Sequence, residues 1–283
     1  MAVIIVKTIS DLETVISKNR ALGNNIGFVP TMGALHQGHL HLIHTATQTN
    51  DCVIASIFVN PTQFYDPGDF ERYPRTLDSD IQQLNSTTCQ ILFIPQVDEI
   101  YPLGYKPLQI DLNGLDTVME GAHRKGHFAG VVNVVSRFFE LIQPNEAFFG
   151  LKDYQQYLII KRLAKINFPS IKIIGIETVR EQTGLALSSR NKLLTKEQYL
   201  FAPVIYEVLC DAKKSINSIK ISQIKMLIEQ RLHEIPDLKI DYIEIADSET
   251  LDTVNEFTTT QKARIFIALF LGRIRLIDNI AIN

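Results

Sequence analysis

The stretch that decides the fold is Pro30-Thr31-Met32-Gly33-Ala34-Leu35-His36-Gln37-Gly38-His39-Leu40-His41-Leu42, directly after the apolar run Ile26–Val29. This pattern predicts a strand, a glycine-containing turn and a helix whose first turn carries His36 and His39. Helix positions three residues apart share a face, so both imidazoles are expected to point at one ligand. Unpaired backbone N–H groups and the helix dipole favour an anion at a helix N-terminus. A nucleotide triphosphate is the expected anion.

Other interpretations of these histidines exist. Capping or surface roles are an ordinary alternative and stay open here. Metal binding is the second alternative, because His36, His39, His41 and His44 are close in sequence. On a helix of about 3.6 residues per turn, however, His41 and His44 are rotated away from His39, so the four cannot share one centre. We therefore do not expect a metal here.

Short apolar runs alternate with helix-period segments over residues 1–177. The expected strands are Ala2–Val6, Ile26–Val29, Cys52–Val59, Ile91–Ile94, Ala147–Phe149 and Ile171–Ile176. The expected helices are Leu40–Thr49, Leu77–Leu84, Val131–Ile142 and Tyr154–Lys165. Such alternation is typical of a parallel sheet covered on both faces, which binds ligands beyond the carboxyl ends of its strands.

The pattern changes near Val179. Two long helical stretches, Lys196–Lys214 and Ser222–Glu234, precede three β-rich runs, Ile240–Ala246, Ala263–Leu271 and Arg273–Ile277. We therefore expect an α/β chain, with a nucleotide- and substrate-binding domain over residues 1–177. Residues 178–283 are expected to form a smaller α+β domain that acts as a lid.

Composition excludes several classes of protein. The 283 residues are 46% hydrophobic and 21% charged, and the net charge of −3 gives no reason to expect nucleic acid or an anionic membrane as a partner. The longest apolar runs are too short to cross a bilayer. Cys52, Cys89 and Cys210 lack metal-ligand spacing, and we expect reduced thiols in a cytoplasmic protein.

Polar residues follow several of the predicted strands. Asn60 and Gln63 offer amides at a strand end, although such residues are also common in plain turns. In the segment Gly150–Gln156, Lys152 could neutralise phosphate and Asp153 could accept from ribose hydroxyls, unless Asp153 is only a helix N-cap. In Leu187–Asn191, two hydroxyls precede a guanidinium, a set suited to phosphate or to a solvated turn. Glu120–Phe128 is expected to be a polar loop that covers an anionic substrate or is mobile and unoccupied.

Two nucleotide-binding signatures are missing from the sequence. It contains neither a Walker-type loop nor a dinucleotide glycine fingerprint. If the chain uses ATP, it does so by another geometry. Attack at the α-phosphate with loss of pyrophosphate suits donors spread along the whole triphosphate.

Taken together, these segments resemble the pantoate–β-alanine ligase family of histidine–glycine–histidine nucleotidylyltransferases, over nearly the whole chain. The segments that carry the resemblance are Pro30–His39, Phe58–Phe64, Tyr73–Thr76, Gly126–Val131, Gln143–Asn145, Phe148–Gly150, Lys152–Gln156, Leu187–Asn191 and Arg273–Asn279. The resemblance implies a Rossmann-like N-terminal domain. It also implies that ATP adenylates pantoate, after which β-alanine attacks the adenylate.

The resemblance also implies roles for particular residues. His39 and His36, with Lys152 and Arg190, would be catalytic, and Gln63 and Gln156 would hold pantoate. The implied ATP site consists of Met32, Gly33, Ala34, Leu35, His36, Gln37, Gly38, His39, Gly150, Leu151, Lys152, Asp153, Val179, Leu187, Ser188, Ser189 and Arg190. Family members need Mg²⁺, are usually homodimers and work in the cytoplasm.

Two positions depart from the commoner family pattern. Leu151 stands where relatives often have a polar residue, and Asp78-Ser79-Asp80 replaces a run often richer in acid. The Mg²⁺ ligands are therefore left open, with phosphate oxygens and water as the chief alternative to side chains. The alternative functions are a related nucleotidylyltransferase that transfers AMP to a phosphate-bearing acceptor and a nucleotide-binding protein that lost catalysis.

Overall fold

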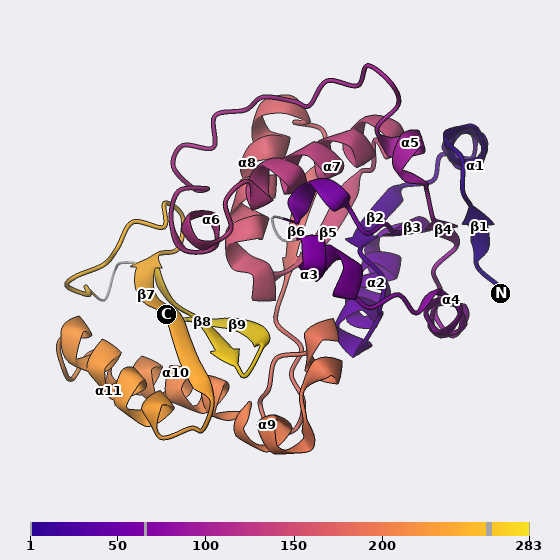
Figure 1. The fold of residues 1–283 in the computed structure, drawn as a ribbon. Coiled ribbons are helices and arrows are strands. Elements are labelled where there is room, and N and C mark those ends of the chain that lie inside the picture. The colour runs from indigo at the N-terminus through magenta and orange to yellow at the C-terminus, as the bar shows by residue number, and fades with distance from the viewer. Residues whose placement is uncertain (1, 65–66, 259–261, 283) are drawn as a thin grey trace. The chain divides into compact units, whose positions relative to one another are not determined.

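The structure is a computed structural model that describes residues 2–64, 67–258 and 262–282 (Figure 1). The chain divides into two compact units. Unit 1 is Met1–Leu151 with Gln156–Glu177, and unit 2 is Lys152–Gln155 with Thr178–Asn283. Residues 152–155, which the sequence pattern placed in the first domain, thus pack with the second unit. The division at 177/178 into two separate domains stays a prediction.

Unit 1 is built on a six-stranded parallel sheet with the strand order β1-β4-β3-β2-β5-β6. The strands are β1 (Ile4–Val6), β2 (Ile26–Thr31), β3 (Cys52–Ile57), β4 (Ile91–Phe93), β5 (Glu146–Gly150) and β6 (Lys172–Ile176). The predicted parallel α/β class is confirmed. Each strand lies within two residues of a predicted apolar run, because burial on both faces requires continuous apolar sequence.

Helices cover both faces of this sheet. They are α1 (Ile9–Ala21), α2 (Gln37–Thr49), α3 (Pro67–Arg72), α4 (Leu77–Asn85), α5 (Val97–Ile100), α6 (Met119–His123), α7 (His127–Ile142) and α8 (Tyr154–Asn167). Neighbouring strand residues point to opposite faces. Val29 of β2 accordingly belongs to a core cluster with Ile43 of α2 and Leu84 of α4. Phe28 instead meets Phe138 of α7, with ring centroids 5.4 Å apart.

Unit 2 contains an antiparallel sheet in the order β7-β8-β9 (Figure 1). Its elements are α9 (Lys196–Phe201), α10 (Val204–Ser215), α11 (Ile221–His233), β7 (Leu238–Asp247), β8 (Ala263–Leu271) and β9 (Ile274–Ala281). Leu209 of α10 and Ile228 of α11 share a core with Ile265 and Leu269 of β8. The single helix predicted over Lys196–Lys214 is wrong, because Pro203 lacks a backbone N–H and separates α9 from α10.

The three cysteines are free thiols. Cys52 and Cys89 are buried, and burial raises the pKa of Cys52 to about 11 and the pKa of Cys89 to about 12. Both are therefore neutral core residues rather than nucleophiles. Over the described residues, the structure contains no helix with the length and apolar character needed to span a bilayer.

Candidate active site

The polar segments predicted from sequence leave neighbouring strands of the unit 1 sheet. β3, β2 and β5 are adjacent and parallel. Met32–His39 follows β2, Gln63 follows β3, and Gly150 ends β5. Because the carboxyl ends of parallel strands meet at one edge, the sheet brings these three segments to the same edge.

The turn after β2 follows a fixed path that depends on two residues in the left-handed region. Gly33 has φ 80° and Ala34 has φ 50°. A Cβ on Gly33 would lie 3.0 Å from Ile57 Cγ2 and 3.2 Å from an Asp80 carboxylate oxygen. Thr31 Oγ1 accepts a hydrogen bond from the Gly33 N–H at 3.1 Å. A glycine is required at this position both for its backbone conformation and for space.

Asp80 of α4 stabilises this turn through hydrogen bonds to its backbone. Its carboxylate accepts from the Ala34 N–H at 2.9 Å, the Leu35 N–H at 2.8 Å and the Thr76 hydroxyl at 3.1 Å. The residue is 1% exposed. The carboxylate that sequence analysis considered for Mg²⁺ is thus engaged by backbone donors. Among residues 2–64, 67–258 and 262–282, no group of three His, Cys, Asp or Glu side chains is arranged to hold a metal ion.

The two histidines lie together at the start of α2, with ring centroids 4.0 Å apart. The prediction that both belong to the first helical turn is wrong, since α2 begins at Gln37 and His36 is its N-cap. Extended backbone at His36 lets its Nδ1 accept the Gly38 N–H at 3.2 Å. An accepting Nδ1 leaves the proton of the neutral ring on Nε2, so His36 caps the helix through Nδ1 and can donate through Nε2.

Asn60 and Gln63 are buried in and beside a short 3-10 turn, η1 (Pro61–Gln63). Asn60 Nδ2 donates to Gln63 Oε1 at 3.1 Å, and Asn60 Oδ1 accepts from the Tyr101 hydroxyl at 2.9 Å. Burial raises the pKa of Tyr101 to about 12, so its hydroxyl stays a donor. Gln63 Nε2 lies 3.1 Å from Met32 Sδ. The predicted acid-binding amide thus contacts the predicted ATP loop.

The segment Glu120–Phe128, expected to be a loop, contains the end of α6 and the start of α7. Glu120 and His127 are each 6% exposed. Arg124 lies between the two side chains. Its Nη1 is 3.6 Å from the Glu120 carboxylate and 3.0 Å from His127 Nε2. His127 Nδ1 in turn lies 2.9 Å from the Gln63 carbonyl oxygen.

In unit 2, Lys152–Gln155 is bound to the C-terminal sheet. Asn279 Nδ2 donates to the Lys152 carbonyl at 2.8 Å, and the Tyr154 hydroxyl donates to the Ser248 carbonyl at 2.9 Å. The Arg264 guanidinium stacks 4.1 Å from the centre of the Tyr154 ring. The Lys152 side chain is half-buried, whereas Asp153 is exposed.

The remaining predicted residues of unit 2 form a second polar group. The Leu187 N–H donates to the Val179 carbonyl at 3.0 Å, which brings these two predicted ATP residues together. Ser188 caps a short 3-10 turn, where its hydroxyl accepts from the Arg190 N–H at 3.3 Å. Ser189 is buried, and Arg190 is half-buried.

Three further predicted residues, which belong to unit 1, flank the segment Lys152–Gln155 along the chain. Gly150 has open space where a Cβ would stand, and Leu151 contacts the position of a Cβ on Gly175. Gln156 lies in the first turn of α8 and is half-buried. Leu151 therefore has a packing role in place of the polar role expected at this position.

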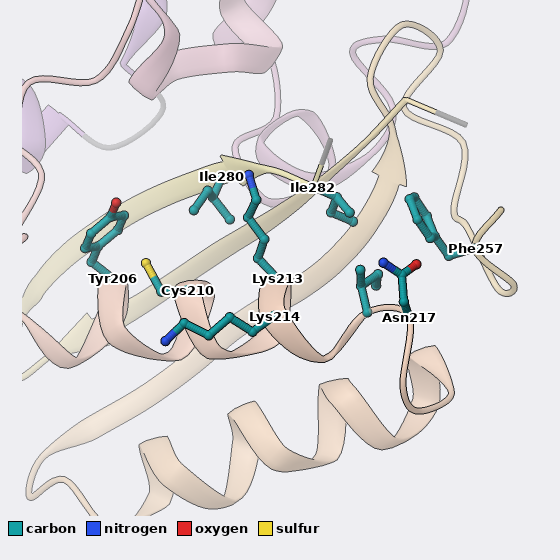
Figure 2. A pocket seen from close by; sticks show the side chains of 9 residues that line it. Tyr206, Cys210, Lys213, Lys214, Asn217, Phe257, Ile280 and Ile282 are labelled. Atoms are coloured by element: carbon teal, nitrogen blue, oxygen red, sulfur yellow. The ribbon is translucent and has the colours of Figure 1, made fainter. Parts of the chain in front are cut away.

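A pocket of about 560 Å³ opens in unit 2 (Figure 2). Tyr206, Cys210, Lys213 and Lys214 of α10 line it, with Ile280 of β9. None of the residues predicted to bind substrate lies in its lining.

Four residues that contact the predicted segments were not assigned this role from the sequence. Asp80 was considered only as a metal ligand, and Arg124 and His127 only as loop cations. Asn279 ends the segment Arg273–Asn279, for which no role was predicted. The sequence feature that could have indicated such roles is a polar residue next to or within an apolar helix or strand pattern. His127 precedes the apolar helix segment Phe128–Val135, and Asn279 lies within β9.

Comparison with known proteins identifies the family. The family model of pantoate-beta-alanine ligase matches residues 4–281. The pantothenate synthetase of Azobacteroides pseudotrichonymphae is 43% identical, covering 98% of this chain and 99% of that protein. The one from Christiangramia forsetii is 45% identical, covering 95% of each chain.

Solved structures give the same result. Pantothenate synthetase from Thermus thermophilus superposes with a TM-score of 0.91 at 38% identity, covering 99% of both chains. Pantoate-beta-alanine ligase from Francisella tularensis, complexed with beta-gamma ATP and beta-alanine, superposes with a TM-score of 0.83 at 38% identity, covering 99% of this chain and 98% of that one. On this evidence the chain belongs to the pantoate–β-alanine ligase family.

Proposed function

We propose that this chain is a ligase that condenses (R)-pantoate with β-alanine to pantothenate, using ATP and releasing AMP and pyrophosphate. One observation carries the proposal: the Gln63 amide contacts Met32 of the turn that leads into the His36–His39 pair. An acyl adenylate forms only where an acid and a triphosphate meet. A carboxylate-binding amide beside a triphosphate-binding helix start is the arrangement that this chemistry needs.

In the first step, a pantoate carboxylate oxygen attacks the α-phosphorus of ATP, and the bond to pyrophosphate breaks. His36 and His39 would donate to the phosphate oxygens at which negative charge develops. Because Nδ1 of His36 accepts the Gly38 N–H, Nε2 is the ring nitrogen that would donate. In unit 2, Lys152 and Arg190 would offset triphosphate charge, and the hydroxyls of Ser188 and Ser189 would donate to it.

In the second step, the β-alanine amine attacks the acyl carbon, and AMP leaves. AMP is a good leaving group, so no covalent enzyme intermediate is needed, consistent with the buried neutral Cys52 and Cys89. The Oε1 of Gln63 is engaged by Asn60, so this amide would act on pantoate as a donor, through Nε2. Gln156 would supply the second amide.

The rest of the predicted ATP site follows the same assignment. Met32–His39, Gly150, Leu151 and Asp153 would line the nucleotide, together with Val179 and Leu187. Mg²⁺ would neutralise phosphate charge when it accompanies ATP, but the described residues do not supply a built site for it, so no step here depends on it. We further propose that the protein is a cytoplasmic homodimer. Sedimentation of the purified chain would test the oligomeric state.

The decisive experiment is ATP–pyrophosphate exchange with pantoate present or absent and without β-alanine. We expect exchange only with pantoate, and pantothenate only after β-alanine is added. An exchange rate that does not change with pantoate but rises with a phosphate-bearing acceptor would favour the alternative nucleotidylyltransferase. His39→Ala should slow exchange by roughly 10²–10³-fold, whereas the exposed His44→Ala should leave it unchanged.

A further inference from the structure

We propose that His127 is a positioning residue that holds Gln63 in its substrate-binding conformation. The inference rests on the proposed function, because it concerns the pocket assigned above to pantoate. His127 lies at the first position of α7 and is 6% exposed. Its Nδ1 lies 2.9 Å from the carbonyl oxygen of Gln63. The ring therefore contacts the backbone of the residue whose side chain is proposed to bind the acid.

Arg124 determines which ring nitrogen of His127 carries the proton. Arg124 Nη1 lies 3.0 Å from His127 Nε2. A guanidinium can only donate, so Nε2 must accept, and the proton of the neutral ring is on Nδ1. The Nδ1–H then donates to the Gln63 carbonyl, which can only accept. Each atom in this chain of contacts has a single compatible role.

Glu120 compensates the charge that this arrangement buries. Its carboxylate lies 3.6 Å from Arg124 Nη1 and is 8% exposed, against 25% for Arg124. Arg124 thus sets the tautomer and the orientation of the His127 ring, and Glu120 balances the charge of Arg124.

Further contacts from α7 immobilise the same turn. Asn60 Nδ2 donates to the Gly130 carbonyl at 3.0 Å as well as to Gln63 Oε1. A Cβ on Gly130 would lie 2.3 Å from the Thr62 carbonyl oxygen and 2.6 Å from Gln63 Cα. The 3-10 turn η1 (Pro61–Gln63) therefore rests directly on α7, and His127 fixes its last residue.

Two variants of equal chemistry and different length test the role of His127. In asparagine the amide nitrogen is as many bonds from Cα as Nδ1 is in histidine, whereas glutamine places it one carbon further. His127→Asn should therefore keep the donor to Gln63, and His127→Gln should lose it. A buried acceptor left without its donor costs enough to change binding about 10- to 100-fold.

The readout is KM in pantoate-dependent ATP–pyrophosphate exchange. We expect His127→Asn to keep KM for pantoate within about 3-fold and His127→Gln to raise it about 10- to 100-fold, with KM for ATP within about 2-fold in both. Equal effects of the two variants, or a parallel rise in KM for ATP, would overturn the proposal. If the unmodified chain shows no pantoate-dependent exchange, the proposed function itself fails, which is a different result.

A second measurement uses the unmodified chain and so does not depend on the folding of a variant. In a ¹⁵N-histidine-labelled sample, the resonances that His127→Asn removes are expected to show a protonated Nδ1 and an unprotonated Nε2. The opposite tautomer, or a doubly protonated ring at neutral pH, would overturn the proposal even if His127→Gln does not fold.

Discussion

Asp80→Ala is expected to destabilise the protein by about 2–7 kcal/mol through the turn after β2. The carboxylate accepts from two buried backbone N–H groups, those of Ala34 and Leu35, at 2.9 and 2.8 Å. Each donor left unsatisfied costs about 1–3 kcal/mol, and loss of the partly buried Thr76 contact adds up to about 1 kcal/mol. Ala34 also has positive φ, a conformation that these two hydrogen bonds help to hold.

The assay is urea unfolding, combined with amide hydrogen exchange at Ala34 and Leu35. Asp80→Asn retains one oxygen acceptor but turns an NH₂ group toward a backbone donor, so it should lose about 1–3 kcal/mol. Asp78→Ala is the matched control, since Asp78 lies in the same first turn of α4 but is exposed, and it should cost no more than about 1 kcal/mol. A loss below about 1 kcal/mol in Asp80→Ala, or equal losses at both positions, would refute the reasoning.

Three other predictions follow from the packing of each unit. Gly130→Ala should raise KM for pantoate in the exchange assay while sparing KM for ATP, because its Cβ would strike the backbone of η1 at 2.3 Å; an unchanged KM contradicts this. Raised pKa values disfavour the thiolate, so at pH 8 Cys52 and Cys89 should be at most roughly one thousandth ionised and resist alkylation, and mass mapping should find the label on Cys210. Asp278→Ala should cost about 3–5 kcal/mol in urea unfolding, because its arginine partner at 2.6 Å keeps a largely buried charge.

Most strands of unit 1 were predictable because each is continuous in apolar residues and lies in the interior of the sheet. The first helix, α1, was not predicted, since only Leu12 and Ile16 on it are buried and its other positions do not mark a face. β9 was predicted to end at Ile277 but continues to Ala281. Its buried Asp278 and Asn279 break the apolar pattern there.

The polar contacts that extend β9 come from residues distant in sequence. Arg180 donates to both Asp278 oxygens, at 2.6 and 2.9 Å, and Arg264 donates to the Asn279 side chain. A local pattern cannot show that such a residue has a buried partner. The same limit explains the segment Glu120–Phe128, where composition indicated a loop and His127 instead lies 2.9 Å from the carbonyl oxygen of Gln63, which is distant in sequence.

The candidate site divides along the same line. The apolar strand patterns were sufficient to place the polar residues after β2 and β3 at one edge of the sheet, whereas the shared role of His36, His39 and Gln63 was predicted from the family resemblance. The supporting residues Asp80 and His127 were not predictable in their roles, since each acts by accepting from or donating to a backbone that only the folded chain brings near.

Residues 152–155 have a consequence for protein engineering. They run from the 3-10 turn after β5 into the first turn of α8, yet Tyr154 and Lys152 contact β8, β9 and Ser248. In a chimaera joined at 177/178, residues 152–155 of this chain would have to pack against residues 178–283 of another protein, without the contacts that they make here. Grafting Lys152–Gln155 along with the donor half, as a second short insert, should restore the match.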